Sequence, residues 1–199
     1  MGGEVRRANS PSSGHLMRFT EQSLSGVFIV APERHIDRRG HFARTFCRDE
    51  FVSHGLAGDF VQCNTSYNAR RGTLRGMHFQ CAPHEETKLV RCTRGAIFDV
   101  VLDLRPDAPT FCRWLAVELT ADNGLALYVP GGFAHGFQSL TDEAEVFYQM
   151  SEQFHPESAG AVRWDDPAFG IEWPIRLPIL SDNDASYQDF CLTIPKDSR

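Results

Sequence analysis

The sequence predicts an all-β protein, folded as an antiparallel double-sheet sandwich or jelly-roll barrel with a few short helices. Gly and Pro recur at short spacing, and runs of about five to eight residues rich in Val, Phe, Leu and Thr lie between them. A parallel sheet would require strands that alternate with long helices, and the sequence shows no such alternation. The 199-residue length suits one domain with its own core, which we expect over residues 18–199.

The clearest strand is predicted at residues 96–104. Phe98, Val100 and Leu102 fall on one alternate set and Asp99 and Asp103 on the other, so we expect one face to pack in the core and the other to tolerate charge. The preceding apolar run at 89–92 is joined to it across residues 93–95, a spacing that predicts a tight hairpin. Further strands are predicted at residues 27–30, 114–119, 125–129, 136–140 and 145–150.

Helical signal is scarce. The best candidate is residues 49–54, where Asp49 can cap the first turn and Gly55 can end the last. Residues 1–17 are predicted to form a flexible polar leader, and they lack the apolar stretch of a secretory signal.

Composition argues against two classes of partner. The chain has 20 basic and 26 acidic residues, and a net charge of -6 gives no general attraction to nucleic acid or to an anionic membrane. No apolar run reaches the ~20 residues that span a bilayer. The six cysteines are irregularly spaced without a CxxC pair, which predicts free thiols in a reducing compartment and hence a cytoplasmic location.

The densest group of chemically useful side chains lies in residues 71–80. In a regular strand His78 would share a face with Leu74 and Gln80, while Arg75 would point the other way. Both side chains can serve one pocket only if Gly76 breaks the pleat, which glycine does readily. The alternative is that His78 is a hydrogen-bonded core histidine.

Two more candidates precede or open apolar strands. Lys88 falls on the same alternate set as Val90 and Cys92, so its ammonium group is predicted to point inward, where it needs an anion or a polarised oxygen. The alternative is an edge lysine whose ammonium group reaches water. His135 follows a glycine turn, and is either a site residue or a structural histidine bonded to a loop carbonyl.

A phenol and a pair of carboxylates complete the set. Tyr148 shares a strand face with Val146 and Met150, and a buried phenol needs a hydrogen-bond partner for its hydroxyl group. Asp165 and Asp166 stand side by side before a proline, which restricts the backbone to extended or turn geometry. The simpler interpretation of Tyr148 is a core tyrosine, and that of Asp165 and Asp166 is a turn.

Four strings in one order make the chain resemble the dTDP-4-dehydrorhamnose 3,5-epimerase family of nucleotide-sugar epimerases: RGTLRGMHFQ, KLVRCTRGAIFDVVLDLRPDAPTF, LYVPGGFAHGFQSL and WDDPAFGIEWP. The likeness spans roughly residues 19–184. It implies a homodimeric jelly roll of the cupin type that acts on a nucleotide-linked 4-keto-6-deoxyhexose without a cofactor. The implied reaction converts dTDP-4-dehydro-6-deoxy-D-glucose to dTDP-4-dehydro-L-rhamnose.

The resemblance also implies roles for the candidates. His78 matches the general base, Tyr148 the general acid and Lys88 the inward lysine of the family. Asp166 matches the carboxylate that pairs with the base, with Asp165 as a substitute. These roles are chemically consistent with epimerisation. Carbons C3 and C5 flank the C4 ketone, so removal of a proton from either gives an enolate that a cation can stabilise.

Further positions are implied to bind substrate. Arg75 matches the arginine that faces the diphosphate, and the other matches are Arg39, Phe42, Arg44, Gln62, Asn64, Glu86, His135 and Trp164. Arg44 stands where the family usually has glutamate, Glu86 where it has glutamine, and Phe154 where a tyrosine is common. These departures leave the identity of the nucleotide base open. They also leave open whether the enzyme inverts C3 alone.

Two other classes of function are compatible with such a barrel. A metal-dependent cupin oxygenase would use His78, His84, Glu86 and His135 as ligands, but such cupins usually place two histidines two residues apart, and here the partner of His78 is Gln80. A non-catalytic nucleotide-sugar-binding module is the third possibility. The joint presence of His78, Lys88, Tyr148 and Asp166 argues against it.

Overall fold

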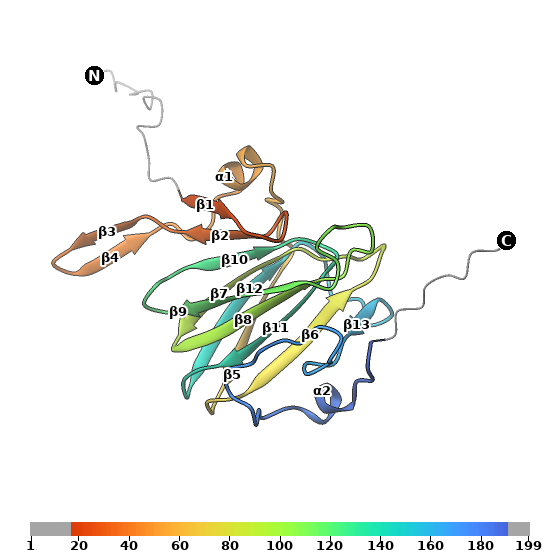
Figure 1. The fold of residues 1–199 in the computed structure, drawn as a ribbon. Coiled ribbons are helices and arrows are strands. Elements are labelled where there is room, and N and C mark those ends of the chain that lie inside the picture. Colours follow the sequence, from red (N-terminus) through yellow and green to blue (C-terminus); the bar gives the residue numbers. More distant parts are fainter. Residues whose placement is uncertain (1–16, 191–199) are drawn as a thin grey trace, which may run out of the picture.

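The computed structural model describes residues 17–190 and is almost entirely β (Figure 1). Its strands and helices, in chain order, are β1 Arg18–Glu21, β2 Phe28–Ala31, β3 Arg34–Asp37, β4 Gly40–Ala43, α1 Arg48–Ser53, β5 Gln62–Asn68, β6 Leu74–Gln80, β7 Lys88–Arg94, β8 Ala96–Asp103, β9 Trp114–Thr120, β10 Ala126–Val129, β11 Phe133–Ser139, β12 Ala144–Met150, β13 Ala159–Ala161 and α2 Asp182–Ser186. Neither helix in the described range has the length and apolar character needed to span a membrane.

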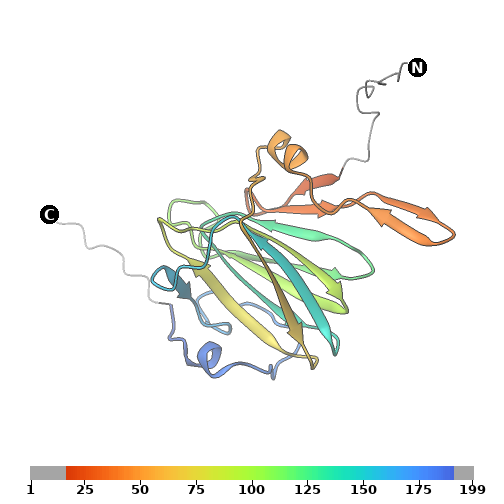
Figure 2. The same cartoon turned by 180° about the vertical axis from the view of Figure 1, so that it is seen from behind.

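Two antiparallel sheets pack face to face. A six-stranded sheet has the order β1-β2-β10-β7-β12-β5, and a five-stranded sheet has the order β13-β6-β11-β8-β9. The hairpin β3–β4 forms a separate two-stranded sheet that projects from the sandwich (Figures 1 and 2). The predicted all-β, double-sheet fold class is therefore confirmed.

Apolar side chains form three layers rather than one. The inner core lies between the sheets and includes Val90, Val101 and Leu127. The outer face of the five-stranded sheet is covered by the C-terminal segment, where Trp173 packs with Leu102. Part of the outer face of the six-stranded sheet is covered by α1, which packs near β2, β7 and β10. Both large sheets thus bury part of their outer face as well as their inner face.

Burial of both faces corrects one expectation about β8. The face that carries Asp99 and Asp103 is not solvated, because both residues have 0% exposure. Asp99 accepts a hydrogen bond from His135, and Asp103 accepts bonds from Arg105 and Thr110. Burial raises the pKa of Asp103, but the hydrogen bonds from Arg105 and Thr110 outweigh it, so the pKa lies below its ordinary value.

The prediction of a hairpin across residues 93–95 is wrong, because the two strands that this turn joins do not pair with each other. β7 belongs to the six-stranded sheet and β8 to the five-stranded sheet, so the turn carries the chain from one sheet to the other. Gly95 allows this crossing because its φ is +74° and a Cβ there would lie 2.2 Å from Thr141 Oγ1. A short turn alone does not distinguish a hairpin from such a crossover.

The other predicted elements agree with the structure in position. The helix predicted at 49–54 corresponds to α1, and the five further strands correspond to β2, β9, β10, β11 and β12. Met17 is buried and its N–H donates to Glu50 Oε2 at 2.7 Å, so this residue packs with the sandwich. The rest of the predicted leader lies outside the described residues. The five described cysteines are free thiols, and Cys191 lies outside that range.

Candidate active site

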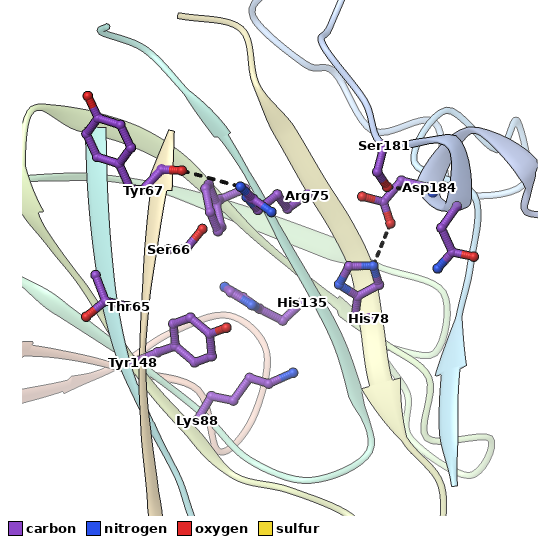
Figure 3. Close-up of a pocket in the computed structure, with 12 residues that line it drawn as sticks. Thr65, Ser66, Tyr67, Arg75, His78, Lys88, His135, Tyr148, Ser181 and Asp184 are labelled. Atoms are coloured by element: carbon purple, nitrogen blue, oxygen red, sulfur yellow. Dashed lines mark hydrogen bonds and ion pairs between the residues drawn. The ribbon is translucent and has the colours of Figure 1, made fainter. Parts of the chain in front are cut away.

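A cleft opens between the two sheets, and side chains from both of them line it (Figure 3). One lobe has a volume of about 440 Å³ and a second of about 540 Å³. His78, Lys88, Tyr148 and Asn183 line both lobes, so the two form one continuous site. The phenol of Tyr148 and the ammonium group of Lys88 point toward the space in front of His78 (Figure 3).

A bulge in β6 brings His78 and Arg75 to the same cleft. His78 pairs with His135 of β11 and Arg75 pairs with Phe137, so β6 has one more residue than β11 between these two pairs. The extra residue reverses the alternation of side chains, and both His78 and Arg75 therefore line the first lobe. Gly76 lies within the bulge at φ +137°, which fits the predicted break in the pleat.

Gly76→Ala is expected to lower the free energy of unfolding by about 3 kcal/mol or more, since a Cβ adds both overlap and backbone strain. That Cβ would lie 2.6 Å from Gly136 Cα. Gly40→Ala is the matched control, because Gly40 also has a large positive φ, +129°, but a Cβ there would meet nothing within 4 Å. Urea denaturation of both variants measures the difference, and equal destabilisation would contradict the steric argument.

The carboxylate that pairs with His78 is Asp184, not the predicted Asp166. His78 Nε2 lies 2.7 Å from Asp184 Oδ1, and Asp184 is 5% exposed. Ser181 caps α2 by accepting a hydrogen bond from Asp184 N–H, which places the carboxylate in the first turn. Helix α2 lies against β6 (Figure 1). The Ser181-x-x-Asp184 spacing is a helix-start pattern that could have indicated this turn.

Asp166 has a structural role instead. Its side chain accepts hydrogen bonds from the N–H groups of Ala168 and Phe190, and thereby ties down the C-terminal segment. Asp165 forms an ion pair with Arg163 at 2.7 Å. Trp164 packs in the outer apolar layer and its carbonyl accepts a bond from Trp173 Nε1, so it does not line the cleft. Sequence proximity to a proline could not separate these roles.

The predicted inward position of Lys88 agrees with the structure. Its side chain is 9% exposed and its Nζ lies 2.7 Å from Glu86 Oε1. Glu86 lines the second lobe, so the pair forms part of the cleft wall. Burial of the ammonium group is compensated by this carboxylate.

His135 is held by a buried carboxylate from the neighbouring strand. His135 Nε2 lies 2.9 Å from Asp99 Oδ1, and the side chains are 9% and 0% exposed. Within the described residues Asp99 Oδ2 has no hydrogen-bond partner. The pair fixes the orientation of the His135 ring at the wall of the first lobe.

Neutral groups hold the Arg75 side chain in place, so its positive charge is not compensated by them. Its Nε donates to Asn68 Oδ1 at 2.9 Å and its Nη2 to the Tyr67 carbonyl at 3.4 Å. In residues 17–190 no carboxylate forms an ion pair with Arg75. Its positive charge is therefore available to an anionic ligand in the first lobe.

The other predicted binding residues divide into two groups. Gln62 and Asn64 line the second lobe, and so does Phe154, which was noted only as a departure from the family pattern. Arg39 and Phe42 instead lie on the projecting β3–β4 hairpin and do not line this chain's own cleft, and Arg44 pairs with Glu50 of α1 at 2.7 Å. Tyr187, missed in the sequence, also lines the second lobe, and burial together with Asp184 raises the pKa of its phenol.

The ligand set of the oxygenase alternative does not assemble. Among the described residues, His84 lies with Glu152 and His155, and it does not join His78, Glu86 and His135 in a group with metal-binding spacing. His78 and His135 each pair with a carboxylate instead.

Comparison with known proteins gives one consistent result. Residues 21–191 match a family model described as dTDP-4-dehydrorhamnose 3,5-epimerase. A protein of that description from Methanothermobacter thermautotrophicus is 43% identical over 86% of this chain and 93% of its own length. The solved structure of the Bacillus anthracis 3,5-epimerase with TDP and PPi bound is 39% identical, with a TM-score of 0.85, over 87% of this chain and 99% of its own. A 3′-monoepimerase from Streptomyces bikiniensis, solved with dTDP-quinovose, is 35% identical with a TM-score of 0.80, over 85% of this chain and 86% of its own.

Proposed function

Because this chain belongs to the dTDP-4-dehydrorhamnose 3,5-epimerase family, we propose that it inverts C3 and C5 of a nucleotide-diphosphate-linked 4-keto-6-deoxyhexose. The favoured reaction converts dTDP-4-dehydro-6-deoxy-D-glucose to dTDP-4-dehydro-L-rhamnose. One observation carries the proposal: an imidazole, a phenol and an ammonium group line the same cleft. The oxygenase alternative is not favoured.

His78 acts as the general base. The protons at C3 and C5 are acidic because both carbons flank the C4 ketone, and an imidazole is a base suited to neutral pH. The Asp184 carboxylate at 2.7 Å orients the ring and stabilises the imidazolium that forms when a proton is taken. The side chain of His78 is 44% exposed to the cleft, so a substrate can reach it.

Lys88 stabilises the enolate. Removal of either proton places negative charge on the C4 oxygen, and a buried ammonium group stabilises that charge more strongly than water does. Glu86 keeps the ammonium group in place before substrate binds.

Tyr148 returns a proton to the opposite face of the sugar. It projects from β12 of the six-stranded sheet, whereas His78 projects from β6 of the five-stranded sheet. A sugar bound between the sheets would therefore have the base on one side and the phenol on the other. This arrangement is what inversion of a carbon centre requires.

Arg75 binds the diphosphate. Two of its nitrogens already donate to Asn68 and Tyr67, and no carboxylate in residues 17–190 pairs with it, so its remaining N–H groups can donate to phosphate oxygens. The reaction moves protons and changes no oxidation state, which is consistent with the expectation that no cofactor is used.

A homodimer would account for the projecting hairpin. Phe42 is 70% exposed and Ile36 is 81% exposed, so the hairpin offers apolar surface to a partner. Arg39 and Phe42 are implied substrate contacts that lie outside their own cleft, and a second copy of the chain could receive them. The cytoplasmic location, and the lack of nucleic-acid or membrane partners, stay predictions.

NMR in deuterium oxide tests the proposed function. With dTDP-4-keto-6-deoxyglucose, the hydrogens at C3 and C5 should be replaced by deuterium and the L-rhamno product should appear. A CDP-linked substrate in parallel tests the nucleotide preference. Absence of exchange with every nucleotide sugar of this type would overturn the proposal.

An enzyme that inverts C3 alone is the second candidate, and Phe154 favours it. Phe154 lines the second lobe but supplies no hydroxyl group where the family commonly has a tyrosine. In the same NMR experiment this candidate predicts loss of the C3 hydrogen only.

The carboxylate partner of the base can be identified by a matched pair of variants. Asp184→Asn should lower kcat by about 10²-fold or more, because the His78 ring loses its orientation and the imidazolium its counter-charge. Asp166→Asn should lower the melting temperature and leave the kcat of the folded enzyme close to that of the wild type. Steady-state kinetics and thermal denaturation separate the two, and the reverse pattern would restore Asp166 as the partner.

A further inference from the structure

Two loops beside the cleft bring a group of potential metal ligands together. The loop between β6 and β7 carries His84, and the loop between β12 and β13 carries Glu152 and His155. One ligand atom from each residue lies within 4.8 Å of the other two. We propose that these three side chains bind a divalent transition-metal ion, Zn²⁺ in the first place.

The hydrogen bonding of His155 leaves the correct nitrogen available. His155 Nδ1 lies 3.1 Å from Glu157 Oε1, so this nitrogen donates, and in the neutral ring Nε2 is the nitrogen that carries the lone pair. His155 Nε2 lies 3.7 Å from Glu152 Oε1. Two ligands of one tetrahedral zinc ion, with bonds of about 2.0–2.1 Å, lie roughly 3.4 Å apart. A carboxylate behind a ligating imidazole is also the usual outer contact of a metal site.

His84 supplies the third ligand. Its ring stacks on that of His155 with centroids 3.5 Å apart and planes 9° apart. An imidazole binds a metal in the plane of its ring, so two parallel rings cannot reach one ion until His84 turns out of the stack. Among the described residues the His84 ring has no hydrogen-bond partner, so it can turn its nitrogen lone pair toward the shared ion.

A buried amide holds the backbone of both loops. Gln80 is 4% exposed, and its Nε2 donates to the carbonyls of His84 and Gln153 at 3.0 and 3.1 Å. Its Oε1 accepts from the N–H of His155 at 2.6 Å. One side chain therefore fixes the separation of the ligand-bearing loops, and metal binding requires only side-chain rotation.

The site is separate from the reacting groups. His84, Glu152 and His155 line neither lobe of the cleft, although the same loops contribute Glu86 and Phe154 to the second lobe. A bound ion would join the two loops without touching the sugar. Binding can be measured without substrate, so this inference does not depend on the proposed reaction.

Titration of the untagged full chain with Co²⁺, after treatment with a chelator, tests the site. We expect one Co²⁺ per chain, with visible absorption that Zn²⁺ abolishes by displacement. His84→Ala, His155→Ala and Glu152→Gln should each weaken binding by about tenfold or more, since even loss of an outer contact costs about 10–100-fold. His54→Ala and Cys81→Ser are the controls and should bind as the wild type does.

A second measurement guards against misfolded variants. Zn²⁺ should raise the melting temperature of the wild type, and that rise should be lost in His84→Ala but retained in His84→Cys, which restores a zinc ligand. The melting temperature of each variant in chelator serves as the folding control. No saturable Co²⁺ binding, or unchanged binding in both histidine variants, would overturn the proposal.

Discussion

Replacement of His78 by alanine should lower the rate of solvent-deuterium exchange at C3 and C5 by about 10²–10⁴-fold, the usual contribution of a positioned general base. His135 also lines the first lobe, but its side chain is 9% exposed against 44% for His78, so it should not replace the base. Substrate binding should change little, since Arg75 and Lys88 remain in place. Proton NMR measures exchange, and isothermal titration measures binding of a dTDP-sugar.

Tyr148→Phe is the control for this variant. Loss of the phenolic hydroxyl group removes the acid but not the base, so exchange should be spared more than formation of the inverted product. The two variants therefore separate the two halves of the reaction. Full exchange in His78→Ala would remove His78 from the role of base, and equal loss of exchange and inversion in Tyr148→Phe would contradict the two-sided mechanism.

Lys88→Met should lower kcat by about 10²–10³-fold, equivalent to about 2.7–4 kcal/mol of lost transition-state stabilisation. Methionine keeps the length and apolar character of the side chain but cannot stabilise the charge on the C4 oxygen. The effect on KM should be smaller, because the charge develops only as the proton leaves. Steady-state kinetics gives both constants.

The Glu86 carboxylate complicates the single substitution and calls for a double variant. Without Lys88 the 9%-exposed Glu86 side chain would be left as an unpaired charge, which destabilises the protein by itself. Lys88→Met combined with Glu86→Gln removes that charge, so its melting temperature should recover while kcat stays low. Glu86→Gln alone keeps the ammonium group and should retain most of the activity. A double variant with wild-type kcat would exclude Lys88 from enolate stabilisation.

Local patterns were sufficient to predict much of the fold and part of the site. The alternation of Lys88 with Val90 and Cys92 predicted the inward ammonium group, because a strand places every second side chain on one face. The glycine between Arg75 and His78 predicted a break in the pleat, and the register of β6 on β11 has an irregularity there. These are properties of a few neighbouring residues.

Long-range pairings were beyond the same reasoning. Asp184 lies 106 positions from His78, and no spacing along the chain indicates that α2 returns to β6. The passage of the chain from one sheet to the other at Gly95 depends on which sheet each strand joins, and so does the burial of Asp99. Asp166 resembled a catalytic carboxylate in the sequence, yet its oxygens are used by backbone N–H groups of its own segment.

The location of Asp184 on α2 has a consequence for biosynthesis. Translation releases the chain from its N-terminus, so every strand of both sheets leaves the ribosome before this carboxylate does. A nascent chain that stops after β13 could pair its strands but would lack the carboxylate that pairs with His78. The carboxylate partner of His78 is therefore synthesised only after the strands of both sheets.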